Sequence, residues 1–298
     1  MAKNLHIEHP EDQIMTGDLR VLDWFDAFST VSVKMDGAPA IVWGTNPENG
    51  KFFVGTKSVF NKRKVKINYT VDDIKANYNE AEYSNLVNVL SACLIYLPRT
   101  NNIYQGDFIG FGGHRYYQPN TICYDFGETV YDSIVVCPHT LYTGSTMRDA
   151  VASPLTGILR STPDTKFVQP TVDSTVRIDT TEMRKLAAKA KFLDKKKIAE
   201  IKVIVNSFIR EGKCIEEDML TLIVGNRPLA QLMRLIYAEK LRMMEGMVIY
   251  DGPVATLGDE VVPAEGFVRS NKYGVYKLID RWKFSRLNFN QPKAWTTK

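Results

Sequence analysis

Short apolar runs separated by turn residues fill the first half of the chain and predict β-strands. One separating segment, Asn46-Pro47-Glu48-Asn49-Gly50, has the residue types of a hairpin turn. Helices are predicted at residues 18–25 and 71–97, where apolar side chains recur every three or four positions, and Pro98 ends the second pattern. The predicted strands are residues 31–34, 40–43, 52–55, 102–109, 121–126 and 133–141.

The second half of the chain changes to a helical pattern. Residues 144–180 are rich in Ser, Thr and Pro, and we expect them to be irregular. A helical section at about residues 181–244 alternates basic and apolar faces, with Gly212 separating its parts. Strands return at residues 246–250 and 274–278, with a loop between them. The fold class is therefore α+β, with mainly antiparallel sheets flanked by helices.

The composition is typical of a globular protein. Hydrophobic residues make up 44% of the chain, and no run of about 18 apolar residues predicts a membrane span. The N-terminus has no apolar signal core. The four cysteines are far apart and form no C-x-x-C pair, which argues against a zinc site or a disulfide framework. We therefore expect a cytoplasmic protein with reduced thiols and no membrane partner.

Basic residues are concentrated in two segments, although the net charge is only +4. Clusters of this kind suit a polyanion such as nucleic acid. The alternative for the second cluster is a solvated face of a charged helix. The first cluster is Lys57, Lys62, Arg63, Lys64 and Lys66; the second is Arg184, Lys185, Lys189, Lys191, Lys195, Lys196, Lys197 and Lys202.

The sequence Lys34-Met35-Asp36-Gly37 is the leading candidate for chemistry. It follows the apolar run that ends at Val33, so a strand is expected to hold the lysine. In a cleft, desolvation and a neighbouring cation lower the pKa of a lysine and free its amine for attack on phosphorus or a carbonyl carbon.

Four further residues have the chemistry of a phosphate or metal site. Lys57 follows a predicted strand and can contact phosphate; an exposed strand-end lysine is the alternative. Asp107 interrupts a strand directly after a glycine, where a turn-facing carboxylate is the alternative. Glu245 opens the strand Gly246-Met247-Val248 and can ligate Mg²⁺. Lys277 lies in a late strand, where it can bind phosphate beside Lys34 and lower its pKa.

In this order, the motifs resemble the covalent nucleotidyltransferase superfamily of ATP-dependent DNA ligases, RNA ligases and mRNA capping enzymes. Lys34-Met35-Asp36-Gly37 is similar to the family's motif I, and Glu245-Gly246-Met247-Val248 is similar to motif IV. Asp107 stands where motif III usually has glutamate, and Tyr124 or Phe126 stands where an aromatic ring stacks on the purine. The segments around residues 36–40 and 46–58 also look like an uncharacterised tailed-phage family of ligase-like type.

The resemblance implies a single nucleotidyltransferase domain over residues 1–298, without an OB-fold domain, in the host cytoplasm if the gene is phage-encoded. Lys34 would accept AMP from ATP with Mg²⁺ or Mn²⁺, with Glu245 and Asp107 as metal ligands. The expected nucleotide-binding residues are Asp36, Gly37, Lys57, Asp107, Tyr124, Phe126, Glu245 and Lys277, and a nucleic-acid 5′-phosphate would receive the AMP.

Three departures from the family pattern leave alternatives open. Pro39 stands where ligases have Arg or Asn, and Lys277 lacks the usual second lysine of motif V. Only 21 residues follow Lys277, too few for an OB-fold domain, which favours an RNA ligase over a DNA ligase or capping enzyme. The alternative from another class is a ligase-fold phage protein that binds nucleotide or nucleic acid without chemistry.

Overall fold

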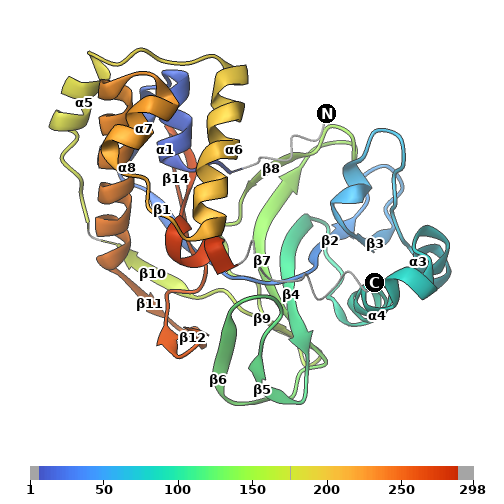
Figure 1. The fold of residues 1–298 in the computed structure, drawn as a ribbon. Coiled ribbons are helices and arrows are strands. Elements are labelled where there is room, and N and C mark those ends of the chain that lie inside the picture. The colour runs from blue at the N-terminus through green and yellow to red at the C-terminus, as the bar shows by residue number, and fades with distance from the viewer. Residues whose placement is uncertain (1–6, 175, 288–298) are drawn as a thin grey trace.

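The structure is a computed structural model that describes residues 7–174 and 176–287. It has a mixed α+β fold with several antiparallel sheets, as the hydrophobic pattern predicts. Figure 1 shows most of the helices gathered on one side and the largest sheet, with the helices that cover it, on the other. The described helices include none that is both long enough and apolar enough to cross a membrane.

The largest sheet has six strands in the order β3-β2-β4-β7-β8, with β9 pairing in parallel with β7. Two helices, α3 (Val71–Asn77) and α4 (Glu80–Tyr96), pack on it through a core that includes Trp43 and Leu90. A capping box between Thr70 and Asp73 fixes the start of α3. The strands are β2 (Ala40–Thr45), β3 (Phe52–Gly55), β4 (Ile103–Phe111), β7 (Ile134–Thr143), β8 (Val151–Pro154) and β9 (Thr165–Phe167).

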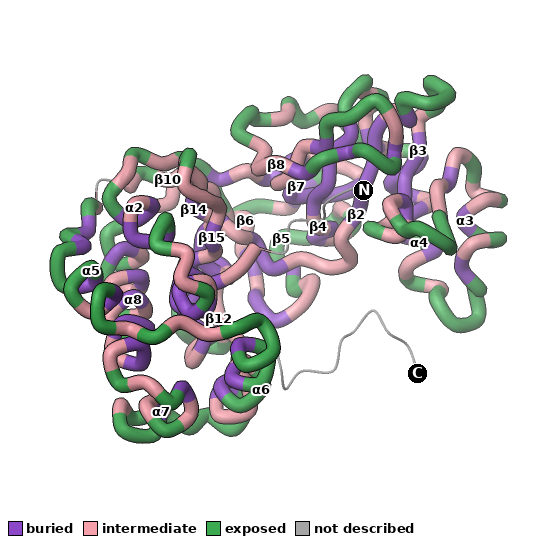
Figure 2. The backbone as a smooth tube through the Cα atoms, turned by 90° about the horizontal axis from the view of Figure 1, so that it is seen from above, coloured by how far each residue is buried: buried purple, intermediate pink, exposed green. Residues whose placement is uncertain are grey.

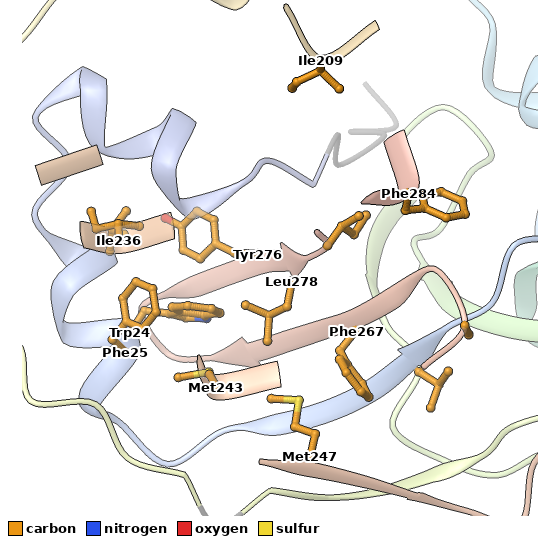
Figure 3. Close-up of a cluster of buried hydrophobic side chains, with 14 of the residues drawn as sticks. Trp24, Phe25, Ile209, Ile236, Met243, Met247, Phe267, Tyr276, Leu278 and Phe284 are labelled. Carbon is orange, nitrogen blue, oxygen red and sulfur yellow. The ribbon is translucent and has the colours of Figure 1, made fainter. Parts of the chain in front are cut away.

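A second, three-stranded sheet has the order β1-β14-β15, and all of its pairings are antiparallel. Its strands are β1 (Thr30–Lys34), β14 (Gly266–Asn271) and β15 (Gly274–Leu278). Buried side chains of the sheet, among them Phe267 and Leu278, share a core with Ile236 and Met243 from the helices (Figure 3). The helices on this side are α1 (Pro10–Gln13), α2 (Arg20–Asp26), α5 (Thr181–Ala187), α6 (Lys195–Glu211), α7 (Glu217–Val224) and α8 (Arg227–Glu245).

Smaller elements connect the two sheets. One four-stranded sheet has the order β13-β12-β6-β5, and β10 pairs with β11. Figure 2 shows that burial follows the strands of the sheets and the inner faces of the helices. The remaining elements are β5 (His114–Tyr117), β6 (Cys123–Val130), β10 (Thr171–Ser174), β11 (Met247–Tyr250), β12 (Val254–Leu257), β13 (Glu260–Val261), the 3₁₀ helices η1 (Ile14–Thr16) and η2 (Lys57–Phe60), and the π-helix η3 (Arg281–Ser285).

The sequence pattern missed strand β14, the central strand of the second sheet. Its alternation is obscured because Arg269 points inward, although a charged side chain normally faces water. Carbonyl oxygens satisfy its guanidinium, which donates to Trp24 O at 2.7 Å and to Ala27 O at 2.8 Å. The segment predicted to be irregular, residues 144–180, also contains the short strands β8, β9 and β10.

Candidate active site

Lys34 is the last residue of β1 and lies opposite Gly266 of β14. Its carbonyl oxygen accepts a hydrogen bond from the Glu265 N–H at 3.0 Å. The lysine side chain borders a cavity of about 440 Å³ and remains 31% exposed. The end of β1 therefore presents the amine to an open space rather than to the core.

The cavity brings together four of the residues predicted from the sequence: Lys34, Lys57, Asp107 and Lys277. They come from β1, η2, β4 and β15, so both sheets contribute to the walls. Other described residues that line the cavity include Val33, Met35, Gln105, His139, Thr140, Tyr142, Ser153, Pro154, Glu265, Val268 and Val275. Residues far apart in sequence thus form one site with three cations and two carboxylates.

Glu265, rather than Glu245, supplies the second carboxylate of this site. The chain contains two Glu-Gly-x-Val segments, at residues 245–248 and 265–268. Glu245 is exposed at the end of α8 and is not among the described residues that line the cavity. Glu265 lies beside Lys34 and forms an ion pair with its amine. The prediction of Glu245 as a site residue and metal ligand therefore does not fit this cavity.

The second Glu-Gly-x-Val segment was overlooked because it opens β14, the strand that the sequence pattern missed. In the sequence, Glu265 carries the same Glu-Gly-x-Val signal as Glu245. Gly266 has a φ of +144°, and a Cβ there would lie 2.1 Å from the carbonyl oxygen of Leu278. Only glycine fits this position, so Gly266 lets β15 approach closely beside Glu265.

Gly37 is needed where the loop after Lys34 crosses β4. A Cβ at Gly37 would lie 2.7 Å from the Cβ of Asp107. The same loop both donates and accepts a backbone hydrogen bond with β4. Ala38 N donates to Phe108 O at 3.1 Å, and Phe108 N donates to Pro39 O at 3.0 Å. Gly37 thus brings Asp107 close to the Lys34 segment through backbone packing.

Asp36 has a structural position, and its carboxylate oxygens are engaged within the protein. One oxygen accepts from the side-chain amide of Asn120 at 2.8 Å. The other accepts from Thr121 N at 2.8 Å and from Ile122 N at 3.1 Å. The residue is buried and is not among the described residues of the cavity wall. Asp36 thus holds the loop before β6, and its predicted contact with a nucleotide stays a prediction.

Neither of the predicted stacking rings, Tyr124 and Phe126, is among the described residues that line the cavity. Tyr124 is fully buried, and its hydroxyl accepts a hydrogen bond from Asp36 N. Phe126 is partly buried and packs edge-on against Tyr117, with ring centroids 5.2 Å apart. The described rings that border the cavity are His139 and Tyr142, both on β7. The sequence placed the expected aromatic residue on β6, whereas the described rings at this cavity lie on β7.

The charges around Lys34 change the expectation about its pKa. Burial lowers the pKa of Lys34, but the carboxylates of Glu265 and Asp107 raise it by more, so it lies above its ordinary value. Lys277 shows the opposite result: burial, and then the positive charge of Lys34, lower its pKa. The predicted lowering of the Lys34 pKa is therefore wrong for this arrangement, in which the two carboxylates favour the charged amine.

Glu265 is held in an environment that disfavours its charge. Burial raises the pKa of this carboxyl group above its ordinary value, against the lowering effect of Lys34. Asp107 also lines the cavity, with Oδ1 3.7 Å from His139 Nε2. Among residues 7–174 and 176–287, no group of three or more His, Cys, Asp or Glu side chains forms a metal site. Asp107 and Glu265 offer the oxygen donors that Mg²⁺ shares with substrate phosphates.

Lys57 opens η2 and is exposed at the cavity edge. Thr56 caps this short helix by accepting a hydrogen bond from Ser58 N. The Ser58 hydroxyl is hydrogen-bonded to Thr56 Oγ1 at 2.8 Å and to Tyr78 OH at 3.1 Å. Lys57 is thus available to an anion in the cavity, whereas the Ser58 hydroxyl is hydrogen-bonded within the protein.

Comparison with known proteins places the chain in a family. A family model matches residues 4–224. The chain belongs to DUF6267, a family of unknown function. The DUF6267 match includes Lys34, Lys57 and Asp107 but ends before Glu265 and Lys277. No curated protein matches the chain, and no solved structure matches it.

Proposed function

We propose that this DUF6267 protein is an ATP-dependent nucleotidyltransferase of the polynucleotide-ligase type, with Lys34 as the residue that accepts AMP. The observation that carries the proposal is the meeting of Lys34, Lys57, Asp107, Glu265 and Lys277 at one cavity. Lysine can act as a nucleophile towards phosphorus, and further cations stabilise the charge that develops on a transferring phosphoryl group.

In the first step, the neutral amine of Lys34 attacks the α-phosphorus of ATP. A phosphorus–nitrogen bond forms, the bond to the bridging oxygen breaks, and pyrophosphate leaves with the electron pair. Lys34 must first lose its ammonium proton, and Glu265 contacts that amine. Because burial raises the pKa of Glu265, its carboxylate is a stronger base than an exposed one.

In the second step, AMP passes to a nucleic-acid 5′-phosphate. An oxygen of that phosphate attacks the same phosphorus, the bond to nitrogen breaks, and Lys34 regains a proton. A 3′-hydroxyl then attacks the activated 5′-phosphate and releases AMP. A bound Mg²⁺ or Mn²⁺ would neutralise phosphate charge, and Asp107 and Glu265 are the carboxylates that would hold it. RNA is the proposed acceptor, with DNA as the alternative.

One observation favours a second candidate function, nucleotide binding without covalent transfer. Lys34 is ion-paired with Glu265, and its pKa lies above the ordinary value, so the resting amine is not a nucleophile. A protein of this kind would use the three cations to hold phosphate and would form no covalent adduct.

Incubation with α-labelled ATP separates the two candidates. The ligase-type proposal predicts acid-stable label on the wild-type protein and none on Lys34→Arg, which keeps the positive charge. Reversible ATP binding without label would support the second candidate and refute the first. Label transfer with GTP, and then sealing of nicked RNA, nicked DNA and single strands, identifies the nucleotide and the acceptor.

A further inference from the structure

The segment between β3 and α3 carries an unusual concentration of positive charge. Residues 56–70 contain five lysine or arginine side chains and no carboxylate. The helical section at residues 181–245 contains 14 cations but also nine carboxylates over more than four times the length. The net positive charge per residue is therefore much higher in the first segment.

The two basic regions also differ in whether their cations form ion pairs. In the helical section, Lys185 pairs with Glu182 at 3.2 Å, and Lys197 lies 3.6 Å from Glu200. Lys62, Arg63 and Lys64 are exposed, and no ion pair among the described residues includes them. The exposed cations of the β3–α3 segment are thus available to bind a partner, whereas carboxylates of the fold balance much of the positive charge of the helical section.

The β3–α3 segment is also attached to the wall of the cavity. Its first cation, Lys57, lines the cavity, and the ring of Phe60 packs against Tyr142 of that wall with centroids 4.4 Å apart. At its other end, Lys66 Nζ donates to the Asn77 carbonyl oxygen at 2.6 Å. Between these fixed points, the exposed turn of residues 61–65 carries Lys62, Arg63 and Lys64. Figure 1 shows this segment as the blue loop beyond β3.

We infer that the exposed cations of residues 57–64 are a docking surface for the sugar-phosphate backbone of a single-stranded nucleic acid whose end reaches the cavity. The inference rests on the proposed function for the direction of the strand and for its end in the cavity. The charge and exposure of the surface do not depend on the chemistry at Lys34. Each phosphate contact that the surface makes releases counterions, which makes binding depend on salt.

Fluorescence anisotropy with labelled single-stranded RNA and DNA tests the inference over about 50 to 200 mM salt. The variant Lys62→Ala/Arg63→Ala/Lys64→Ala should bind more weakly. Its slope of log K against log salt should be shallower by about 2, because each single-strand contact contributes about 0.7. In the single variant Arg63→Ala, the slope should be shallower by about 0.7. The matched control Lys195→Ala/Lys196→Ala/Lys197→Ala removes equal charge from α6 and should leave the slope nearly unchanged.

The inference is overturned if the salt slope becomes shallower in the α6 variant instead, or if it changes in neither variant. It is also overturned if the turn binds anionic vesicles but no oligonucleotide. Because binding is measured without ATP, this outcome is distinct from failure of the proposed function. A protein that forms no label at Lys34 but shows the predicted slopes would refute the chemistry and keep the docking surface.

Discussion

Replacing Glu265 by glutamine removes the negative charge that contacts Lys34 and nearly keeps the side-chain volume. At about 4 Å and an effective dielectric constant of about 20, two unit charges attract by ~4 kcal/mol. Because the Lys34 side chain is 31% exposed, water screens the pair, and we expect about half of this energy. Loss of this attraction should lower the pKa of Lys34, because the charge of Glu265 is the largest of the effects that raise it. Burial would then lower the pKa of Lys34 against the opposing effects of Asp107 and Asp36 alone.

The assay is the rate at which an amine-reactive acylating reagent modifies Lys34, measured against pH and located by peptide mass spectrometry. The rate rises as the amine loses its proton, so the rise should begin at lower pH in Glu265→Gln than in the wild type. Glu245→Gln is the matched control, since it changes the exposed glutamate of the other Glu-Gly-x-Val segment. An equal shift in Glu245→Gln, or no shift in Glu265→Gln, would refute the assignment of Glu265 to the site.

Three further predictions concern the framework that holds the site. Gly266→Ala should lower the free energy of unfolding by about 3 kcal/mol because of strain and overpacking, against about 1 kcal/mol for Gly258→Ala, where a Cβ meets open space; equal losses in urea titrations would contradict this. Asp36→Ala leaves buried N–H donors without an acceptor and should cost about 3 kcal/mol, with ATP binding retained at temperatures below the new midpoint. Burial holds the pKa of His9 well below its ordinary value, so stability should fall as pH drops below about 6.5, and less so in His9→Phe; identical pH profiles of the melting temperature would contradict it.

The sequence pattern predicted the elements whose hydrophobic spacing is regular. The alternation that ends at Val33 and the helical repeats of α4 and α8 follow directly from which side chains face the core. Strand β14 could not be read in this way, since its buried Arg269 is satisfied by carbonyl groups of the distant α2 region. These distant carbonyl groups allow a charged side chain at a buried position, where the hydrophobic pattern alone would predict an exposed one.

The candidate site shows the same limit. Lys34, Lys57, Asp107 and Lys277 could be nominated because charged residues beside strands are conspicuous in sequence. The choice between Glu245 and Glu265 depends on which strand pairs with β1, and that pairing is a long-range property of the fold. The role of Asp36 also depends on a distant segment, the loop at residues 120–122 that its carboxylate holds.

Peptide mass spectrometry after incubation with ATP and Mg²⁺ tests the central claim most directly. The account predicts a mass increase equal to AMP on the peptide that contains Lys34, its removal by added pyrophosphate, and its absence from Lys34→Arg. An unmodified Lys34 peptide in a protein that binds ATP, or AMP attached to another lysine such as Lys57 or Lys277, would contradict the account.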